Sequence, residues 1–137
     1  MVSKRPALKR ASYAMSGLVV AFMVLDGVMK LVPFDIVIKS TADLGYPASI
    51  AFARGLGVLA LTCTALYAAP RTAVLGAILL TAYMGGAVAS HLRLGDPLFT
   101  HILFGVYLAV LAWGGLYLRD PRLRALLPLR STISPDE

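Results

Sequence analysis

Apolar residues along this chain are gathered into four long runs, each separated from the next by a short segment that contains proline or charged residues. The runs extend over residues 12–31, 48–69, 72–92 and 98–118. Each is close to the ~20 apolar residues that an α-helix needs to cross the hydrocarbon core of a bilayer. The pattern therefore predicts an all-α fold: an antiparallel bundle of four transmembrane helices.

Prolines mark boundaries between these runs. Pro33 ends the first run and Pro97 opens the fourth, because proline cannot continue a helix but is well tolerated in its first turn. Only Pro70 and Arg71 separate the second run from the third, so these spans are expected to form a tight antiparallel hairpin. The longest connection, residues 34–46, is expected to carry a short helix at the membrane surface.

Basic residues are distributed unevenly on the two sides of the spans. The chain of 137 residues has 13 lysines and arginines against 7 acidic residues, so its net charge is +6. Only Lys39 and Arg93 lie clearly on the side away from the termini. The others flanking the spans lie on the side of the termini: Lys4, Arg5, Lys9, Arg10, Arg71, Arg119, Arg122, Arg124 and Arg130. The positive-inside rule predicts that both termini are cytoplasmic and that the protein is a multi-pass protein of the cell (cytoplasmic) membrane.

This distribution also defines the expected organisation of the chain. Residues 1–11 form a basic cytoplasmic N-terminal segment, residues 12–118 the four-helix transmembrane domain, and residues 119–137 a basic cytoplasmic tail. Basic and leucine residues in the tail suit a short helix lying on anionic headgroups. A basic chain can indicate nucleic-acid binding. Here the basic residues flank apolar runs, so the expected partner is the lipid bilayer and no nucleic acid.

Small residues recur in the last two spans. Ala82, Gly86 and Ser90 stand at every fourth position of the third span, and the fourth span contains Gly105 and Gly115. Small residues at this spacing allow helix backbones to approach closely in lipid. We expect them to hold the bundle together within one chain, with a homo-oligomer interface as the alternative.

Seven ionisable residues fall at the outer ends of the spans. With both termini inside, the ends of the first and third spans meet the beginnings of the second and fourth on the outer side. Charges within a membrane cost roughly 2.5–3.5 kcal/mol each on insertion scales and are kept where they pair or line a polar cavity. The candidate pocket residues are Asp26, Lys30, Arg54, His91, Arg93, Asp96 and His101.

The residues alone leave two interpretations of this cluster open. Asp26 and Lys30 share one helix face, and Arg54 lies at a depth similar to Asp26, so an ion pair between Asp26 and Arg54 is expected to tie the first span to the second. Asp96, before Pro97, fits the N-cap of the fourth span. Alternatively, the cluster forms the polar walls of a pocket that opens outward.

Specific chemical signatures are lacking. His91 and His101 raise the possibility of a metal site, but their spacing matches no recognised ligand signature, and no metal is predicted. The chain has no nucleotide-binding glycine motif and no Ser-His-Asp pattern at informative spacing. We therefore assign no catalytic residue, and whether the protein is an enzyme is left undecided.

Strings on all four spans, in order, resemble the bacterial DoxX-like family. They are residues 26–30 (DGVMK), 44–47 (LGYP), 70–77 (PRTAVLGA), 80–91 (LTAYMGGAVASH), 92–99 (LRLGDPLF) and 113–119 (WGGLYLR). The resemblance covers roughly residues 12–130 and implies a four-helix protein of the cytoplasmic membrane. It implies little about activity. The wider DoxX group includes a small subunit of an archaeal thiosulfate:quinone oxidoreductase and membrane partners of redox-stress systems.

Two positions depart from the family pattern. Relatives usually carry a glutamate within a Leu-Glu-Leu string of the second span, where this chain has Ala60. The buried carboxylate on which a proton-linked role would rest is therefore missing. Relatives also often have a proline where this chain has Gly105, a change expected to leave the fourth span straighter.

Together these observations favour a non-catalytic membrane subunit or accessory module linked to quinone or redox chemistry, with a redox enzyme complex as its protein partner. The alternative is a membrane enzyme or binding protein for an apolar small molecule, a quinone or a lipid. No cofactor is predicted, although a quinone would suit the pocket. A transporter is disfavoured, because the chain is short and has no inverted repeat.

Overall fold

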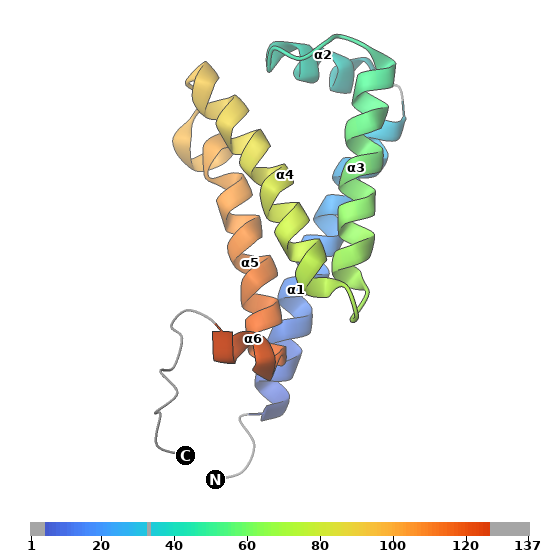
Figure 1. Ribbon diagram of the computed structural model, residues 1–137. Helices are drawn as coiled ribbons and strands as arrows, with labels where there is room; N and C mark the ends of the chain where they lie inside the picture. The colour runs from blue at the N-terminus through green and yellow to red at the C-terminus, as the bar shows by residue number, and fades with distance from the viewer. Residues whose placement is uncertain (1–4, 33, 127–137) are drawn as a thin grey trace, which may run out of the picture.

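The computed structural model describes residues 5–32 and 34–126, and these residues form helices joined by short turns (Figure 1). Four spans are long and apolar enough to cross a membrane. They are α1 (Arg5–Leu31), α3 (Ile50–Ala68), α4 (Ala73–Leu94), and a fourth span made of the π-helix η1 (Leu98–Ile102) and α5 (Phe104–Arg119). Two short helices, α2 (Asp35–Asp43) and α6 (Pro121–Leu126), complete the fold, and the described residues contain no strand. The predicted bundle and the short helix after the first span are confirmed.

The four spans form a closed ring in which each helix packs against two neighbours. Helix α1 packs against α3 and α5, and α4 packs against the same two helices on the opposite side. The start of α1 and the short α6 lie at one end, which we call the inner end, whereas α2 crosses the opposite, outer end (Figure 1). The assignment of the inner end to the cytoplasm stays a prediction, and the tail beyond Leu126 lies outside the described residues.

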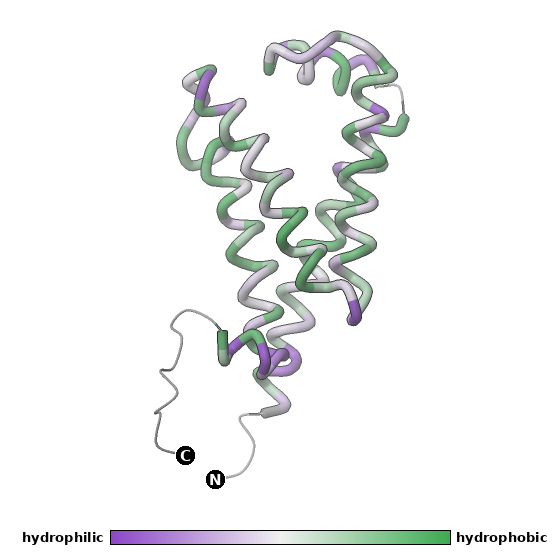
Figure 2. The backbone as a smooth tube through the Cα atoms, in the orientation of Figure 1, coloured by the Kyte–Doolittle hydropathy of each residue, from purple (hydrophilic) through white to green (hydrophobic). Residues whose placement is uncertain are grey.

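The surface of the bundle is apolar along the middle of the spans. Hydrophilic residues lie mainly toward the ends of the bundle: around α6, at the α3–α4 hairpin, in α2 and at the outer tip of α4 (Figure 2). Large apolar side chains such as Leu18, Leu25 and Val110 point outward, and each is more than half exposed. A soluble protein rarely exposes so much contiguous apolar surface. The protein is therefore a small integral membrane protein whose helices contact the bilayer.

Close helix contacts depend on glycine at two crossings. At the hairpin between α3 and α4, a Cβ atom on Gly76 would lie only 2.1 Å from the backbone nitrogen of Tyr67. Between α1 and α3, a Cβ atom on Gly57 would lie 2.7 Å from the carbonyl oxygen of Gly27. Only a residue without a side chain permits these approaches. The tight hairpin predicted from the short Pro70–Arg71 connection is thus confirmed.

The small residues of the third span have a different role from the predicted one. Gly105 of α5 does pack closely against Met84 and Val88 of α4, but no atom lies within 4 Å of a Cβ placed on Gly86. Ala82, Gly86 and Ser90 face a cavity instead of a helix. The reason is that α3 and α4 diverge from their hairpin toward the outer end (Figure 1). The expected packing against a helix of the same chain is therefore wrong for Gly86, and the alternative of a homo-oligomer interface stays a prediction.

The beginning of the fourth span is also irregular. Residues Leu98–Ile102 form a π-helix, and the regular α-helix begins only at Phe104. The wider turn is held by backbone bonds such as that from the Leu103 amide to the Leu98 carbonyl, at 2.8 Å. A π-turn thus interrupts the regular hydrogen-bond ladder at the start of this span. That Gly105 leaves the span straighter than a proline would stays a prediction.

Candidate functional site

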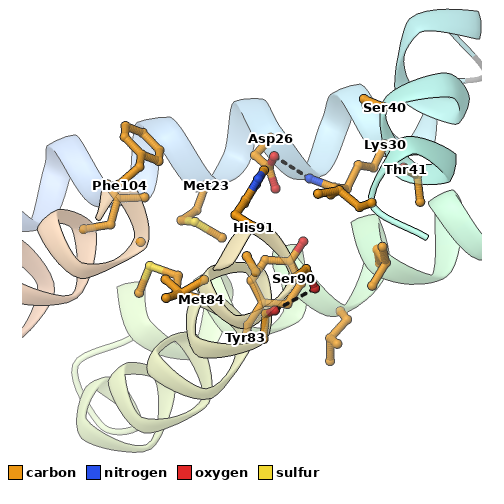
Figure 3. Close-up of a pocket in the computed structure, with 18 of the residues that line it drawn as sticks. Met23, Asp26, Lys30, Ser40, Thr41, Tyr83, Met84, Ser90, His91 and Phe104 are labelled. Atoms are coloured by element: carbon orange, nitrogen blue, oxygen red, sulfur yellow. Dashed lines mark hydrogen bonds and ion pairs between the residues drawn. The ribbon is translucent and has the colours of Figure 1, made fainter. Parts of the chain in front are cut away.

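A cavity of about 530 Å³ occupies the outer half of the bundle. Its walls come from all four spans, and α2 covers its outer side through residues such as Val37 and Thr41. Side chains of α1 face those of α4 across the cavity (Figure 3). This position follows from the topology, because α1 and α4 are diagonal in the ring and are held apart by α3 and α5.

Asp26 and Lys30 are the charged side chains that line the cavity. They lie one turn apart on α1, and the Lys30 ammonium donates a hydrogen bond to the Asp26 carboxylate (Figure 3). Both side chains are largely buried, at 29% and 19% exposure respectively. The Tyr83 hydroxyl of α4 lies near the same carboxylate. The pair therefore adds polarity to the cavity without adding net charge.

The predicted ion pair between Asp26 and Arg54 is wrong. Arg54 is exposed, and its Nε donates to the carbonyl oxygen of Leu31 at 3.2 Å. Leu31 ends α1, and the last carbonyls of a helix lack partners within the helix and attract cations. Arg54 thus ties the first span to the second, as expected, but by capping α1 and not by an ion pair.

Two histidines meet at the outer end of α4 and η1. The His91 and His101 rings both line the cavity and lie 5.5 Å apart, edge to face. Nδ1 of His91 is 2.6 Å from the Asp96 carboxylate, and Nδ1 of His101 is 2.8 Å from the Thr100 hydroxyl. Because each Nδ1 has a protein partner, each Nε2 is the ring atom left to meet a ligand.

This geometry corrects the predicted role of Asp96. Its side chain bonds His91 instead of capping the fourth span, and no side chain caps η1. Asp96 lies outside the cavity and orients a residue that lines it. Within residues 5–32 and 34–126, no three His, Cys, Asp or Glu side chains are grouped in a way that could hold a metal ion.

The connection from α2 to α3 is fastened to α4 over the cavity. The Arg93 guanidinium donates to the Leu44 carbonyl oxygen at 2.7 Å. The Tyr46 hydroxyl lies 2.6 Å from that of Ser90, which itself donates to the Gly86 carbonyl oxygen at 2.9 Å. Tyr46 is therefore the donor to Ser90. Arg93 therefore lies outside the cavity and joins the end of α2 to the end of α4 instead of lining the pocket.

Four of the seven sequence-based candidates thus line the cavity: Asp26, Lys30, His91 and His101. Arg54, Arg93 and Asp96 lie outside it. Sequence reasoning missed two lining residues of α4. Tyr83 lies about two helical turns before His91, and Ser90 lies directly before it. The helical repeat places Tyr83 and Ser90, seven residues apart, on one face of α4, and Ser90 is adjacent to His91; this spacing was the available signal. Ala60, where relatives usually carry glutamate, is fully buried in the core and does not line the cavity.

A second polar region lies at the inner end of the bundle. A cavity of about 440 Å³ is lined there by residues that include Tyr13, Ser16 and Arg119. Ser16 and Tyr67 are buried and hydrogen-bonded to each other at 2.8 Å. No sequence pattern indicated this contact, because it joins side chains on different spans.

Comparison with known proteins identifies the family and no individual relative. Residues 14–115 match the DoxX-like family. No curated protein and no solved structure gives a significant match. The matched segment contains α3 and α4 in full and most of α1 and α5, and it includes the residues of these helices that line the outer cavity. The chain therefore belongs to the DoxX-like family of small four-helix membrane proteins.

Proposed function

We propose that this protein binds a membrane-soluble amphipathic molecule, a quinone or a lipid, in its outer cavity. The observation that carries the proposal is a cavity of about 530 Å³ with apolar walls and polar groups gathered from α1, α2, α4 and η1. Ligand sites typically enclose roughly 300–1,000 Å³ and combine apolar walls with a few polar groups. The cavity is therefore large enough for a ring with part of an attached tail.

The apolar walls suit a flat or flexible hydrocarbon. Met23 and Met84 face each other across the cavity from α1 and α4 (Figure 3). The rings of Phe22 and Phe104 are 4.8 Å apart and close the wall between α1 and the fourth span. Methionine side chains adapt to irregular apolar surfaces, and aromatic edges offer contacts to planar rings.

The polar groups favour a neutral head with oxygen atoms. Asp26 and Lys30 neutralise each other, and the lining contains no other Asp, Glu, Lys or Arg. A ligand with a full charge would therefore lie in the cavity without a countercharge, which is costly in a poorly hydrated site. Carbonyl or hydroxyl oxygens, by contrast, can bond to Lys30, Tyr83 or a histidine Nε2.

Access to the cavity favours ligands that arrive through the bilayer. The outer side is covered by α2 and by the fastened segment around Tyr46. Between the diverging helices α3 and α4, the lining residues Leu59 and Gly86 are exposed, Leu59 to 49%. This side of a transmembrane bundle faces acyl chains. A quinone or lipid dissolved in the hydrocarbon layer would enter here without crossing water.

The resemblance to quinone-linked relatives extends this proposal toward redox chemistry. In that form, the protein is an accessory subunit that holds a quinone while a partner enzyme supplies the electrons. The cavity supports only the binding of a quinone or lipid, not the transfer of electrons. The link to a redox complex rests on the family and would be tested by co-purification of a quinone-dependent enzyme with the full-length chain.

Two neighbouring glycines provide a matched test of the cavity. At Gly85 and at Gly86 alike, no atom lies within 4 Å of the position that a Cβ would take, yet only Gly86 lines the cavity. Gly86→Leu should place an isobutyl group in the binding space and weaken binding of decylubiquinone by about tenfold or more, equivalent to about 1.4 kcal/mol. Gly85→Leu should bind like wild type. Isothermal titration calorimetry of both variants in detergent micelles measures the difference.

Two results would contradict the proposal. Equal affinities of the Gly86→Leu and Gly85→Leu variants would show that decylubiquinone binds elsewhere. If wild-type protein neither binds this quinone nor retains a quinone or lipid through purification, as measured by mass spectrometry of extracts, the cavity has no ligand of the proposed class.

A further inference from the structure

A directed chain of hydrogen bonds crosses the inner end of the bundle. The Arg119 guanidinium of α5 donates to the Ser16 hydroxyl of α1 at 2.6 Å. The Tyr67 hydroxyl of α3 donates to the Ala112 carbonyl oxygen at 2.9 Å, so Ser16 is the donor in its 2.8 Å bond to Tyr67. Three spans thus cooperate to hold one guanidinium in a fixed position. A cation that only flanks a membrane span needs no such support.

The charge of Arg119 is not neutralised by these contacts. Its guanidinium also lies 5.5 Å from the centre of the Tyr13 ring, another neutral partner. Among residues 5–32 and 34–126, the two salt bridges are Lys30–Asp26 and His91–Asp96, so no described carboxylate pairs with Arg119. The half-buried guanidinium lines the cavity of about 440 Å³, where further N–H groups are free to bind an anion.

The surroundings of this cavity are strongly basic. Asp120 also lines it, but one carboxylate oxygen accepts the backbone N–H of Arg122 at 2.9 Å and thereby begins α6. Asp120 is the only acidic residue in the described parts of the inner end. The basic residues there include Lys9, Arg10, Arg71, Arg119, Arg122 and Arg124. The resulting positive potential favours an anionic ligand.

We infer that this inner cavity binds the phosphate group of an anionic membrane phospholipid, with Arg119 as the residue that contacts the phosphate. A planar guanidinium donates two parallel hydrogen bonds to phosphate oxygens, which makes arginine well suited to this group. The remaining wall includes the apolar side chains of Val20, Val74 and Leu116. Val20 and Leu116 each lie about one turn further from the inner end than Ser16 and Asp120, so the wall favours a phosphate that carries acyl chains over a free phosphate ion.

The test compares two arginines that carry the same charge in different surroundings. Arg119→Gln removes the guanidinium in the cavity, whereas Arg122→Gln removes an exposed one on α6. Full-length protein in zwitterionic micelles is titrated with dioleoyl phosphatidylglycerol, dioleoyl phosphatidylcholine or inorganic phosphate. Thermal unfolding is followed with a thiol-reactive fluorogenic maleimide, since the single cysteine, Cys63, is buried until the bundle opens.

We expect phosphatidylglycerol to raise the unfolding midpoint of wild type and of Arg122→Gln by several degrees more than phosphatidylcholine does. Arg119→Gln should lose most of this difference, with an affinity for phosphatidylglycerol about fivefold weaker, as expected for one charge near an anionic surface. Inorganic phosphate should give no shift. Equal phosphatidylglycerol shifts in the two variants, equal effects of the two lipids on wild type, or a full shift with inorganic phosphate would each overturn the inference.

If Arg119→Gln fails to fold, a pair of conservative lysine substitutions tests the same inference. Arg119→Lys and Arg122→Lys both retain the charge, but an ammonium group cannot offer two parallel N–H groups to a phosphate. The phosphatidylglycerol shift of Arg119→Lys should fall below that of Arg122→Lys. Equal shifts in this pair would also overturn the inference. Binding of decylubiquinone in the outer cavity is not involved in either comparison.

Discussion

The packing of Gly76 against α3 is so tight that the addition of one methyl group tests the fold. A Cβ atom on Gly76 would lie 2.1 Å from the backbone nitrogen of Tyr67, 2.4 Å from its Cα and 2.6 Å from the carbonyl carbon of Leu66. All three atoms belong to the backbone of α3, so none can rotate away. The shortest distance is more than an ångström below the 3.4 Å at which ordinary van der Waals contact begins.

Gly76→Ala therefore requires α3 and α4 to separate at their hairpin. Overpacking of this kind typically costs about 1–3 kcal/mol, occasionally more. The higher helix propensity of alanine offsets roughly 1 kcal/mol of that cost. Moving Tyr67 also disturbs its hydrogen bonds to Ser16 and Ala112. We expect the free energy of unfolding to fall by about 1–3 kcal/mol.

Gly85→Ala is the control on the same helix. No atom lies within 4 Å of a Cβ at Gly85, so this variant should unfold like wild type or be more stable by up to about 1 kcal/mol. Unfolding in mixed micelles with increasing SDS, followed by labelling of buried Cys63, measures both variants. If the two variants agree within about 0.5 kcal/mol, the tight packing at Gly76 is refuted.

Two further predictions concern polar groups within the bundle. Asp26→Leu should lower the free energy of unfolding by up to about 3 kcal/mol because it leaves the Lys30 charge unpaired in the membrane. A second substitution, Lys30→Leu, should recover much of this loss, whereas Arg54→Leu should not. Recovery with Arg54→Leu would instead support an ion pair between Asp26 and Arg54, which the structure excludes. Tyr67→Phe should cost roughly 0.6–1.7 kcal/mol through its lost hydrogen bonds, whereas lipid-facing Tyr107→Phe should cost nothing measurable by the same SDS titration.

The four spans were predictable from the chain alone because the bilayer imposes a length and a composition on any helix that crosses it. The hairpin between α3 and α4 was equally predictable, since the short connection around Pro70 and Arg71 favours an antiparallel pair of neighbouring helices. The convergence of Asp26, Lys30, His91 and His101 followed from the alternating direction of the spans. These inferences use only position along the chain and the direction of each crossing.

Contacts between spans depended on information that the chain alone does not contain. The positions of Arg54 and Asp26 along their spans put them at a similar depth in the membrane. The rotation of α3 about its axis, however, points Arg54 at the free carbonyl oxygen of Leu31. Small residues at Ala82 and Gly86 allowed close packing, but the divergence of α3 and α4 left them facing a cavity. Spacing within a helix defines a face and does not say which neighbour that face meets.

The polar ends of the bundle show the same division. A four-span membrane protein with ionisable residues at its outer ends could be predicted from the chain alone. That four of those residues line one cavity, and that Arg119 meets Ser16, 103 positions earlier, at the other end, became visible only in the folded bundle. The physical reason is that lipid tails are as apolar as the helix surfaces. Hydropathy therefore selects the spans, whereas close packing and hydrogen bonds between helices select their rotation and tilt.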